Sequence, residues 1–279
     1  MACALLLSAC ASKPAAPGTP KLALVIGNAA YENAPVLRNP INDASDMCAS
    51  LGKLGFRTLC HTNVRNHDEF EALVKGYVDQ LGPNTVGVFF YSGHGVQANG
   101  ANFLVPTQAT VKAATEDPRG VLYSIDNLVK SLGQKPARFQ LIILDACRTD
   151  LFASSPRTSA PSTLVRSLET VARASYGLAA IQDAPPRTTV FYATASREAA
   201  SDGAGRNGAF TKHIVRNIGA PGVTVEQFMK QVTAGVVDET ERLGKLQRPY
   251  SYSSFSGEFC FVTCPESRPP PGPILPPVN

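Results

Sequence analysis

Two reactive side chains in this sequence, a histidine and a cysteine, each stand just after a long apolar run. His94 lies between two glycines after the run at 86–91, and Cys147 follows the run at 139–144. A thiolate is a strong nucleophile, and an imidazole within hydrogen-bonding reach can take the proton from the thiol. If the two runs form neighbouring strands, this pair has the chemistry needed to hydrolyse an amide through a covalent acyl intermediate.

Each of the two residues also has a plainer interpretation. A lone histidine is more often structural, and a cysteine among apolar residues is usually part of the core. Here both follow apolar strands, and both neighbour small residues that let another molecule approach closely. This shared arrangement favours a catalytic interpretation of His94 and Cys147.

The order of apolar segments predicts an α/β fold around a parallel sheet. Strands are expected at 21–28, 55–60, 86–94, 139–144 and 188–194, helices at 41–51, 68–81, 124–132, 208–218 and 225–237, and a last extended segment at 250–262. Unbroken apolar runs are typical of strands buried on both faces, and the alternation of strands with helices requires crossover connections. The third strand is expected to end at His94, at the carboxyl edge of the sheet, where ligands and chemistry collect in such folds.

Two short motifs resemble the catalytic motifs of the caspase-like cysteine peptidases, in particular those of the bacterial metacaspase-like, or orthocaspase, branch. They are Tyr-Ser-Gly-His-Gly at 91–95 and Asp-Ala-Cys-Arg at 145–148. The interval of 53 residues from His94 to Cys147 fits the known caspase pattern, in which the histidine precedes the cysteine by about 50 residues. Thr149 replaces the glycine that follows in that pattern. The similarity continues through 37–44, 177–179, 192–194 and 205–208, and it spans about residues 21–262.

The resemblance implies both a fold and roles for individual residues. The fold is a caspase-like three-layer α/β sandwich, with a mostly parallel six-stranded sheet flanked by helices. Cys147 becomes the nucleophile, His94 the general acid and base, and the backbone N–H groups of Gly95 and Cys147 the donors to the oxyanion. No third residue of a catalytic triad is identified, and a monomer is expected.

The resemblance also predicts the substrate. The metacaspase-like branch holds arginine or lysine with acidic residues, whereas caspases proper hold aspartate with arginines. Asp43 and Asp145 match the acidic pocket positions, with Ser92 on the pocket wall, and Pro40 stands where the family often has a cysteine. Polypeptides with Arg or Lys before the cleaved bond are therefore the expected substrates. The alternatives are a helix cap for Asp43 and a strand-end hydrogen bond for Asp145.

The chain divides into a leader and tether at 1–20, a peptidase-like domain at 21–262 and a proline-rich tail at 263–279. Leu-Ser-Ala-Cys at 7–10 resembles a bacterial lipobox. It predicts an exported protein that is periplasmic or attached to a membrane through a lipid on Cys10, and the alternative is an apolar leader without lipid. The tail is expected to be disordered because its prolines cannot continue a helix or a central strand.

Five of the seven cysteines follow the leader. An exported protein could pair four of them, and Cys147 is the best candidate for the remaining thiol. The pairing of Cys48, Cys60, Cys260 and Cys264 is left open, and all four could equally be reduced core residues. Cys260 and Cys264 are too far apart to bridge if both lie in one extended strand.

Several other function classes lack support in the sequence. Net charge is +4, but Lys and Arg are scattered, so nucleic-acid binding is not expected. No Gly-x-Gly-x-x-Gly or phosphate loop follows the first strand, which disfavours a nucleotide-binding protein. The cysteines and histidines lack the paired spacing of a zinc site, so no metal or other cofactor is expected. Calcium dependence occurs in parts of the wider family, but the acidic residues here are too dispersed to support a site.

Two functional interpretations of the resemblance remain: an active cysteine endopeptidase, and a catalytically silent binding or scaffold module on the same fold. The presence of both His94 and Cys147 favours the peptidase. The long stretch at 149–187 has no strand signal, and long connections of this kind are usually functional or mobile. Arginines in and beside it are candidate self-cleavage sites, at Arg148, Arg157, Arg166 and Arg173.

Overall fold

A computed structural model describes residues 18–98, 101–110, 117–147, 178, 181, 184–194 and 205–264. The leader with Cys10, the four candidate cleavage sites and the tail from Pro265 lie outside these residues. Among the helices that the structure describes, none is both long and apolar enough to cross a bilayer.

The fold is built on a six-stranded sheet in the order β2-β1-β3-β6-β7-β8. Its strands are β1 (Lys21–Gly27), β2 (Arg57–Thr62), β3 (Val86–Ala98), β6 (Phe139–Cys147), β7 (Thr188–Tyr192) and β8 (Tyr250–Ser253). Every neighbouring pair from β2 to β7 is parallel, and β8 is antiparallel to β7. The predicted mostly parallel six-stranded sheet is confirmed.

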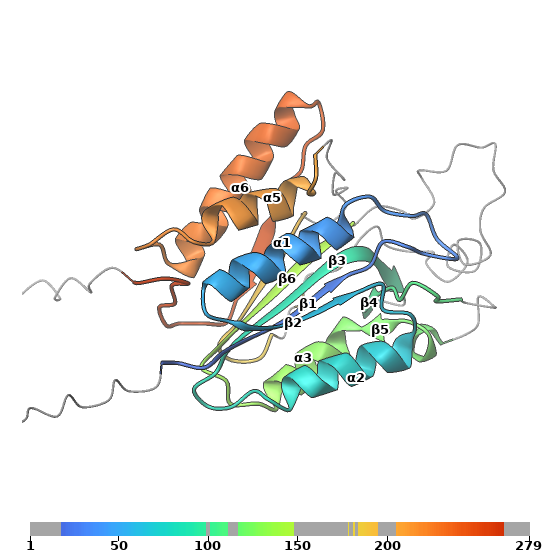
Figure 1. Ribbon diagram of the computed structural model, residues 1–279, viewed down its shortest axis with the longest axis horizontal. Coiled ribbons are helices and arrows are strands. Elements are labelled where there is room, and N and C mark those ends of the chain that lie inside the picture. Colours follow the sequence, from blue (N-terminus) through green and yellow to red (C-terminus); the bar gives the residue numbers. More distant parts are fainter. Residues whose placement is uncertain are drawn as a thin grey trace, which may run out of the picture.

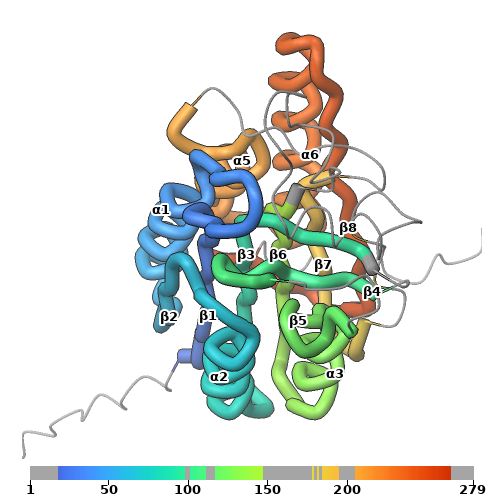
Figure 2. Tube along the Cα trace, turned by 90° about the vertical axis from the view of Figure 1, so that its right-hand side faces the viewer, coloured from blue at the N-terminus to red at the C-terminus, as the bar shows by residue number. Residues whose placement is uncertain are grey.

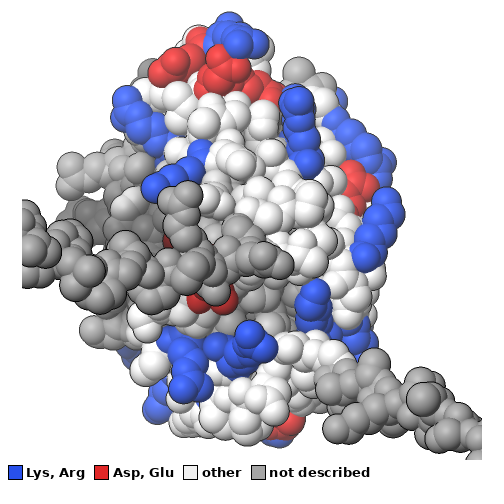
Figure 3. All heavy atoms as spheres, turned by 90° about the vertical axis from the view of Figure 1, so that its left-hand side faces the viewer, with Lys and Arg blue, Asp and Glu red and all other residues white. Residues whose placement is uncertain are grey.

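Helices cover both faces of this sheet and complete the three layers. One face carries α1 (Pro40–Lys53), α5 (Ala209–Asn217) and α6 (Val225–Arg242), and the other carries α2 (His67–Val78) and α3 (Ile125–Gly133), as Figure 1 shows. A 3-10 helix at Pro118–Gly120 precedes α3. On the face drawn in Figure 3, Lys and Arg lie in several separate places with Asp and Glu among them.

The side chains of β3 alternate between two hydrophobic clusters. Val88 and Phe90 belong to the cluster beneath α1, α5 and α6, whereas Phe89 and Tyr91 belong to the cluster beneath α2 and α3. Since side chains along a strand repeat every second residue, the face of Val88 and Phe90 continues at Ser92 and His94. The sheet therefore presents these polar residues on the side of α1 and α5.

The expectation that the third strand ends at His94 is wrong, because β3 continues to Ala98. Beyond His94 its partner is no longer β6 but β4 (Ala101–Leu104), which runs antiparallel to it and also pairs with β5 (Tyr123–Ser124). Figure 2 shows β3 and β4 side by side. The hairpin supplies backbone hydrogen-bond partners that the strand would otherwise lack after leaving the main sheet.

The last extended segment is also shorter than expected. β8 ends at Ser253, and the chain then turns so that Cys260 and Cys264 form a disulfide, with Cα atoms 5.2 Å apart. The sequence analysis excluded this bridge only if both cysteines lay in one extended strand. The turn brings them close enough to bond. A second disulfide joins Cys48 of α1 to Cys60 of β2. These pairs leave Cys147 outside both bridges.

Candidate active site

His94 and Cys147 are register partners on the adjacent parallel strands β3 and β6. Neighbouring strands lie about 4.8 Å apart, so the backbones of the two residues are immediate neighbours. Cys147 is the last residue of β6, whereas His94 is followed by the β3–β4 hairpin. The sheet therefore brings together the histidine and the cysteine that the sequence analysis singled out.

The imidazole of His94 is buried and oriented by a backbone carbonyl. Its Nε2 lies 2.8 Å from the carbonyl oxygen of Pro35, in the loop between β1 and α1. A carbonyl can only accept a hydrogen bond, so Nε2 carries the proton and Nδ1 is the proton-accepting nitrogen of the neutral ring. The sequence analysis missed this orienting group, since a backbone carbonyl leaves no mark on residue type.

Two tyrosine hydroxyls fix the backbone of His94. Its N–H donates to Tyr31 Oη at 2.8 Å, and Tyr91 Oη donates to its carbonyl at 2.9 Å. The two hydroxyls lie 3.2 Å apart, and the ring of Tyr31 is 4.4 Å from the imidazole, centroid to centroid. Gly93 is required beneath them, because a Cβ there would lie 2.6 Å from the hydroxyl of Tyr31. The sequence analysis assigned no role to Tyr31.

The three expected pocket residues also lie together, on the α1 and α5 side of the sheet. Asp43 is 2% exposed and accepts hydrogen bonds from Ser92 Oγ at 3.0 Å and from the Gly208 N–H at 3.1 Å. Ser92 is the register partner of Asp145, which is half-buried. Thr211 of α5 donates to the Asp145 carboxylate at 2.6 Å. Two carboxyl groups from different elements thus flank one serine.

The position of Asp43 depends on a close approach between α1 and β1. A Cβ on Gly27 would lie 2.2 Å from the carbonyl oxygen of Pro40, so only glycine lets the helix begin this near the strand. Asn39 is the N-cap and Pro40 opens the first turn, which places Asp43 inside the helix. The helix-cap interpretation of Asp43 is therefore wrong, whereas Asp145 does make the strand-end hydrogen bond considered as its alternative.

Burial disfavours the charged form of Asp43. Desolvation, together with the nearby charge of Asp145, raises the pKa of Asp43 to about 8, against the lowering effect of hydrogen bonds from Asn207, Ser92 and Gly208. Burial and a like charge both disfavour the ionised carboxylate. A guanidinium or ammonium group placed next to the two carboxyl groups would favour their ionised forms.

Comparison with known proteins assigns the family. A sequence model of the caspase domain matches residues 20–260. The chain belongs to the caspase family of cysteine peptidases. It is similar to mucosa-associated lymphoid tissue lymphoma translocation protein 1 of Homo sapiens and to the homolog of Mus musculus, at 27% identity over 128 residues in each case. This match covers 46% of the chain and about one seventh, 15%, of either relative.

Comparison with solved structures shows the same fold. The crystal structure of caspase-1 from Spodoptera frugiperda superposes with a TM-score of 0.61 at 12% sequence identity. The match covers 88% of this chain and 93% of that one. The caspase fold therefore extends over nearly the whole chain, although the sequences have diverged widely.

A loop before α5 packs beside the residues expected to form the pocket. Arg206 makes a bidentate ion pair with Asp46 of α1, at 3.0 and 3.1 Å, and Asn207 donates to the same carboxylate at 2.9 Å. These contacts dock the loop so that the Gly208 N–H reaches Asp43. The resemblance included residues 205–208, but it gave none of them a role.

The backbone N–H of Gly95 does not take part in the hydrogen bonds between β3 and β4. Val105 donates its N–H to the carbonyl of His94 at 3.1 Å. In an antiparallel pair this bond makes Gly95 and its partner Leu104 a non-hydrogen-bonded pair, whose N–H groups point away from the opposite strand. The N–H of Gly95 therefore points away from β4.

Proposed function

We propose that this caspase-family protein is an active cysteine endopeptidase that cleaves after Arg or Lys. The observation that carries the proposal is the register of β3 and β6, in which His94 is paired with Cys147 and Ser92 with Asp145. The nucleophile, the base and two of the three proposed pocket residues are thus carried by the same two strands, two residues apart, and Asp43 of α1 is the third. The basic specificity is that of the metacaspase-like branch, to which we assign the chain.

The reaction uses groups that the fold already holds. Nδ1 of His94 takes the thiol proton of Cys147, whose sulfur attacks the scissile carbonyl carbon and forms a tetrahedral oxyanion. The N–H groups of Gly95 and Cys147 donate to that oxyanion. The intermediate then collapses, the C–N bond breaks, and the leaving amine takes the proton from His94. Water, deprotonated by His94, hydrolyses the thioester and regenerates the thiol.

The orienting contacts of His94 serve both proton transfers. Because the carbonyl of Pro35 accepts a hydrogen bond from Nε2, the neutral ring has an unprotonated Nδ1, which can accept the thiol proton. The same carbonyl stabilises the imidazolium that forms when Nδ1 is protonated. The backbone carbonyl of Pro35 thus orients the histidine, as the carboxylate of a catalytic triad does in other hydrolases.

Substrate selection rests on Asp43 and Asp145, with Ser92 between them. An arginine or lysine side chain favours ionisation of both carboxyl groups and pairs with them, whereas an aspartate side chain brings a further negative charge to the site. Leaving a desolvated charge unpaired costs about 2–5 kcal/mol, which corresponds to at least tenfold selectivity. Long basic side chains before the cleaved bond are therefore preferred.

A positional peptide library tests the proposal. The wild-type protein and a Cys147→Ala variant are compared, each with and without calcium, and an active-site thiol probe is applied to the wild type. We expect hydrolysis after Arg and Lys that disappears in the variant. A preference for aspartate would contradict the pocket, hydrolysis by Cys147→Ala would contradict the nucleophile, and absence of both cleavage and probe labelling would identify a silent module.

We further propose attachment to a bacterial membrane through a lipid on Cys10, on the basis of the lipobox-like residues 7–10. Expression in a bacterial host with labelled palmitate tests this. Label on the wild type and none on Cys10→Ser is expected, and equal labelling of the two proteins would reject the proposal.

A further inference from the structure

Three side chains of types that can ligate a metal gather at the end of the sheet opposite to the proposed active site. Ligand atoms of Glu258, Cys260 and Cys264 all lie within 4.8 Å of one another. Lys21, the first residue of β1, hydrogen-bonds the backbone of this segment, whereas His94 lies near the carboxyl ends of the strands. The cluster therefore belongs to none of the catalytic or pocket groups.

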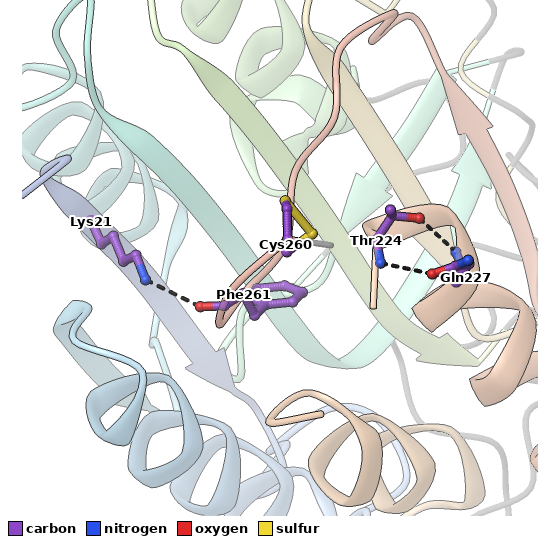
Figure 4. The surroundings of a disulfide bond; sticks show 6 residues. Lys21, Thr224, Gln227, Cys260 and Phe261 are labelled. Carbon is purple, nitrogen blue, oxygen red and sulfur yellow. Dashed lines mark hydrogen bonds between the residues drawn. A yellow bond between two sulfur atoms is a disulfide. The ribbon is translucent and has the colours of Figure 1, made fainter. Parts of the chain in front are cut away.

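Backbone contacts hold the cluster in place independently of its disulfide. Val225 donates its N–H to the carbonyl of Phe259 at 2.8 Å, and Gly222 donates to the carbonyl of Thr263 at 2.8 Å. Cys260 also forms an isolated β-bridge with Thr224, at the start of α6, and Figure 4 shows both residues. The two sulfur-bearing residues thus stay close when the bond between them is opened.

The side chains next to the cluster anchor the segment in the core. Phe259 and Phe261 are 8% and 3% exposed and belong to the cluster beneath α1, α5 and α6. Lys21 Nζ donates to the carbonyl of Phe261 at 3.2 Å, which Figure 4 also shows. Cys264 is exposed, so its sulfur is within reach of a reductant while the anchor remains buried.

We propose that Glu258, Cys260 and Cys264 form a redox-controlled site for a thiolate-binding divalent cation such as Zn²⁺. In the oxidised chain both sulfurs are used by the disulfide, and only the carboxylate of Glu258 is available. In the reduced chain two thiolates and one carboxylate converge, which is a donor set that zinc accepts, with a water in the fourth position. The expectation of no zinc site rested on sequence spacing and did not include the turn that joins these residues.

A dithiol can act as the reductant that opens the disulfide between Cys260 and Cys264. A thiolate of the dithiol attacks the exposed sulfur of Cys264, the S–S bond breaks, and closure of the dithiol to its own disulfide leaves Cys260 and Cys264 as thiols. Zinc binding then releases the two thiol protons, and zinc stays divalent. Reoxidation of the sulfurs expels the cation.

The test uses the full chain carrying Cys147→Ala, in reduced and oxidised form. Co²⁺ is titrated anaerobically and followed by sulfur-to-cobalt charge-transfer absorption, and Zn²⁺ is then added to displace it. We expect one equivalent of cobalt in the reduced protein and no charge-transfer absorption in the oxidised protein. The absorption should survive in a Cys48→Ser, Cys60→Ser variant and vanish in a Cys260→Ser, Cys264→Ser variant.

Glu258→Gln supplies a test that does not depend on the fold of the cysteine variants, because this side chain is exposed. It should keep the charge-transfer absorption and lower zinc affinity at least about tenfold, as the loss of a ligand requires. Zinc should also raise the melting temperature of the reduced protein but not of the oxidised one. Absence of the absorption in the reduced chain, its persistence without Cys260 and Cys264, or unchanged affinity in Glu258→Gln would overturn the proposal.

Discussion

The hydroxyl of Tyr31 accepts the backbone N–H of His94 at 2.8 Å, and its ring packs against the imidazole of the same residue. One side chain thus holds both the backbone and the ring of the proposed acid and base. Tyr31 lies in the loop that also supplies the carbonyl of Pro35. Loop and imidazole therefore form one structural unit, and small changes in the loop should alter catalysis.

Replacement of Tyr31 by Phe should lower kcat more than it raises KM. The change keeps the ring but leaves the buried N–H of His94 without its acceptor, at a cost of about 1–3 kcal/mol. We expect kcat for an arginine peptide to fall roughly tenfold or more. Steady-state kinetics measure this.

Tyr77→Phe is the matched control, since Tyr77 is another buried tyrosine but lies on α2. Its kcat should match the wild type. A fall of kcat in both variants, or in neither, would contradict a specific role for Tyr31.

How much of this arrangement could be foreseen depends on the kind of signal each part leaves in the sequence. The apolar runs in β3 and β6 are buried on both faces, so the pattern located these strands and placed Ser92 and Asp145 directly after the runs. Asp43 came from the family resemblance. In that sense the main sheet and the grouping of Asp43, Ser92 and Asp145 were predictable.

Other parts leave no such signal. The carbonyl of Pro35 orients His94, but every residue type has a carbonyl. The continuation of β3 to Ala98 depends on pairing with β4, and its glycines and polar residues resemble a loop. The bridge of Cys260 to Cys264 depends on a turn whose geometry is set by tertiary contacts.

The raised pKa of Asp43 predicts how stability varies with pH. The native state holds this proton more tightly than the unfolded chain, in which the pKa is near 3.8. The contribution to stability is therefore fully present below about pH 4 and is lost as pH rises through about 8. Asp43→Asn should remove this decline, which urea unfolding between pH 5 and about 9 measures.

Asp46 provides a control of opposite sign. Its hydrogen bond with Arg206 holds the pKa of the carboxyl below its usual range. Its contribution is thus present above the unfolded pKa and is lost as pH falls through the folded value. Asp46→Asn should leave the decline toward pH 8 unchanged, and a loss of that decline in both variants would reject the assignment to Asp43.

The ion pair of Arg206 with Asp46 should affect substrate binding without affecting the chemical step. Arg206→Lys breaks the bidentate geometry and loosens the loop that brings the Gly208 N–H to Asp43. Because the pair is largely exposed, the expected cost is about 0.2–1 kcal/mol, a rise in KM of up to roughly fivefold. Arg65→Lys, in the exposed pair with Glu69, is the control and should leave KM unchanged. A lower kcat with constant KM would argue against docking as the function of this pair.

Gly93→Ala tests whether the packing of the tyrosine hydroxyls requires glycine. The new Cβ would lie 2.6 Å from the hydroxyl of Tyr31 and 2.7 Å from that of Tyr91, so at least one hydrogen bond to His94 must break. We expect a loss of about 1–3 kcal/mol in unfolding free energy, together with a lower kcat. Gly76→Ala is the control, since a Cβ there meets no atom within 4 Å and alanine favours the helix by roughly 0.5–1 kcal/mol. If Gly93→Ala were as stable and as active as the wild type, the tyrosine pair would not constrain His94 in the way the structure indicates.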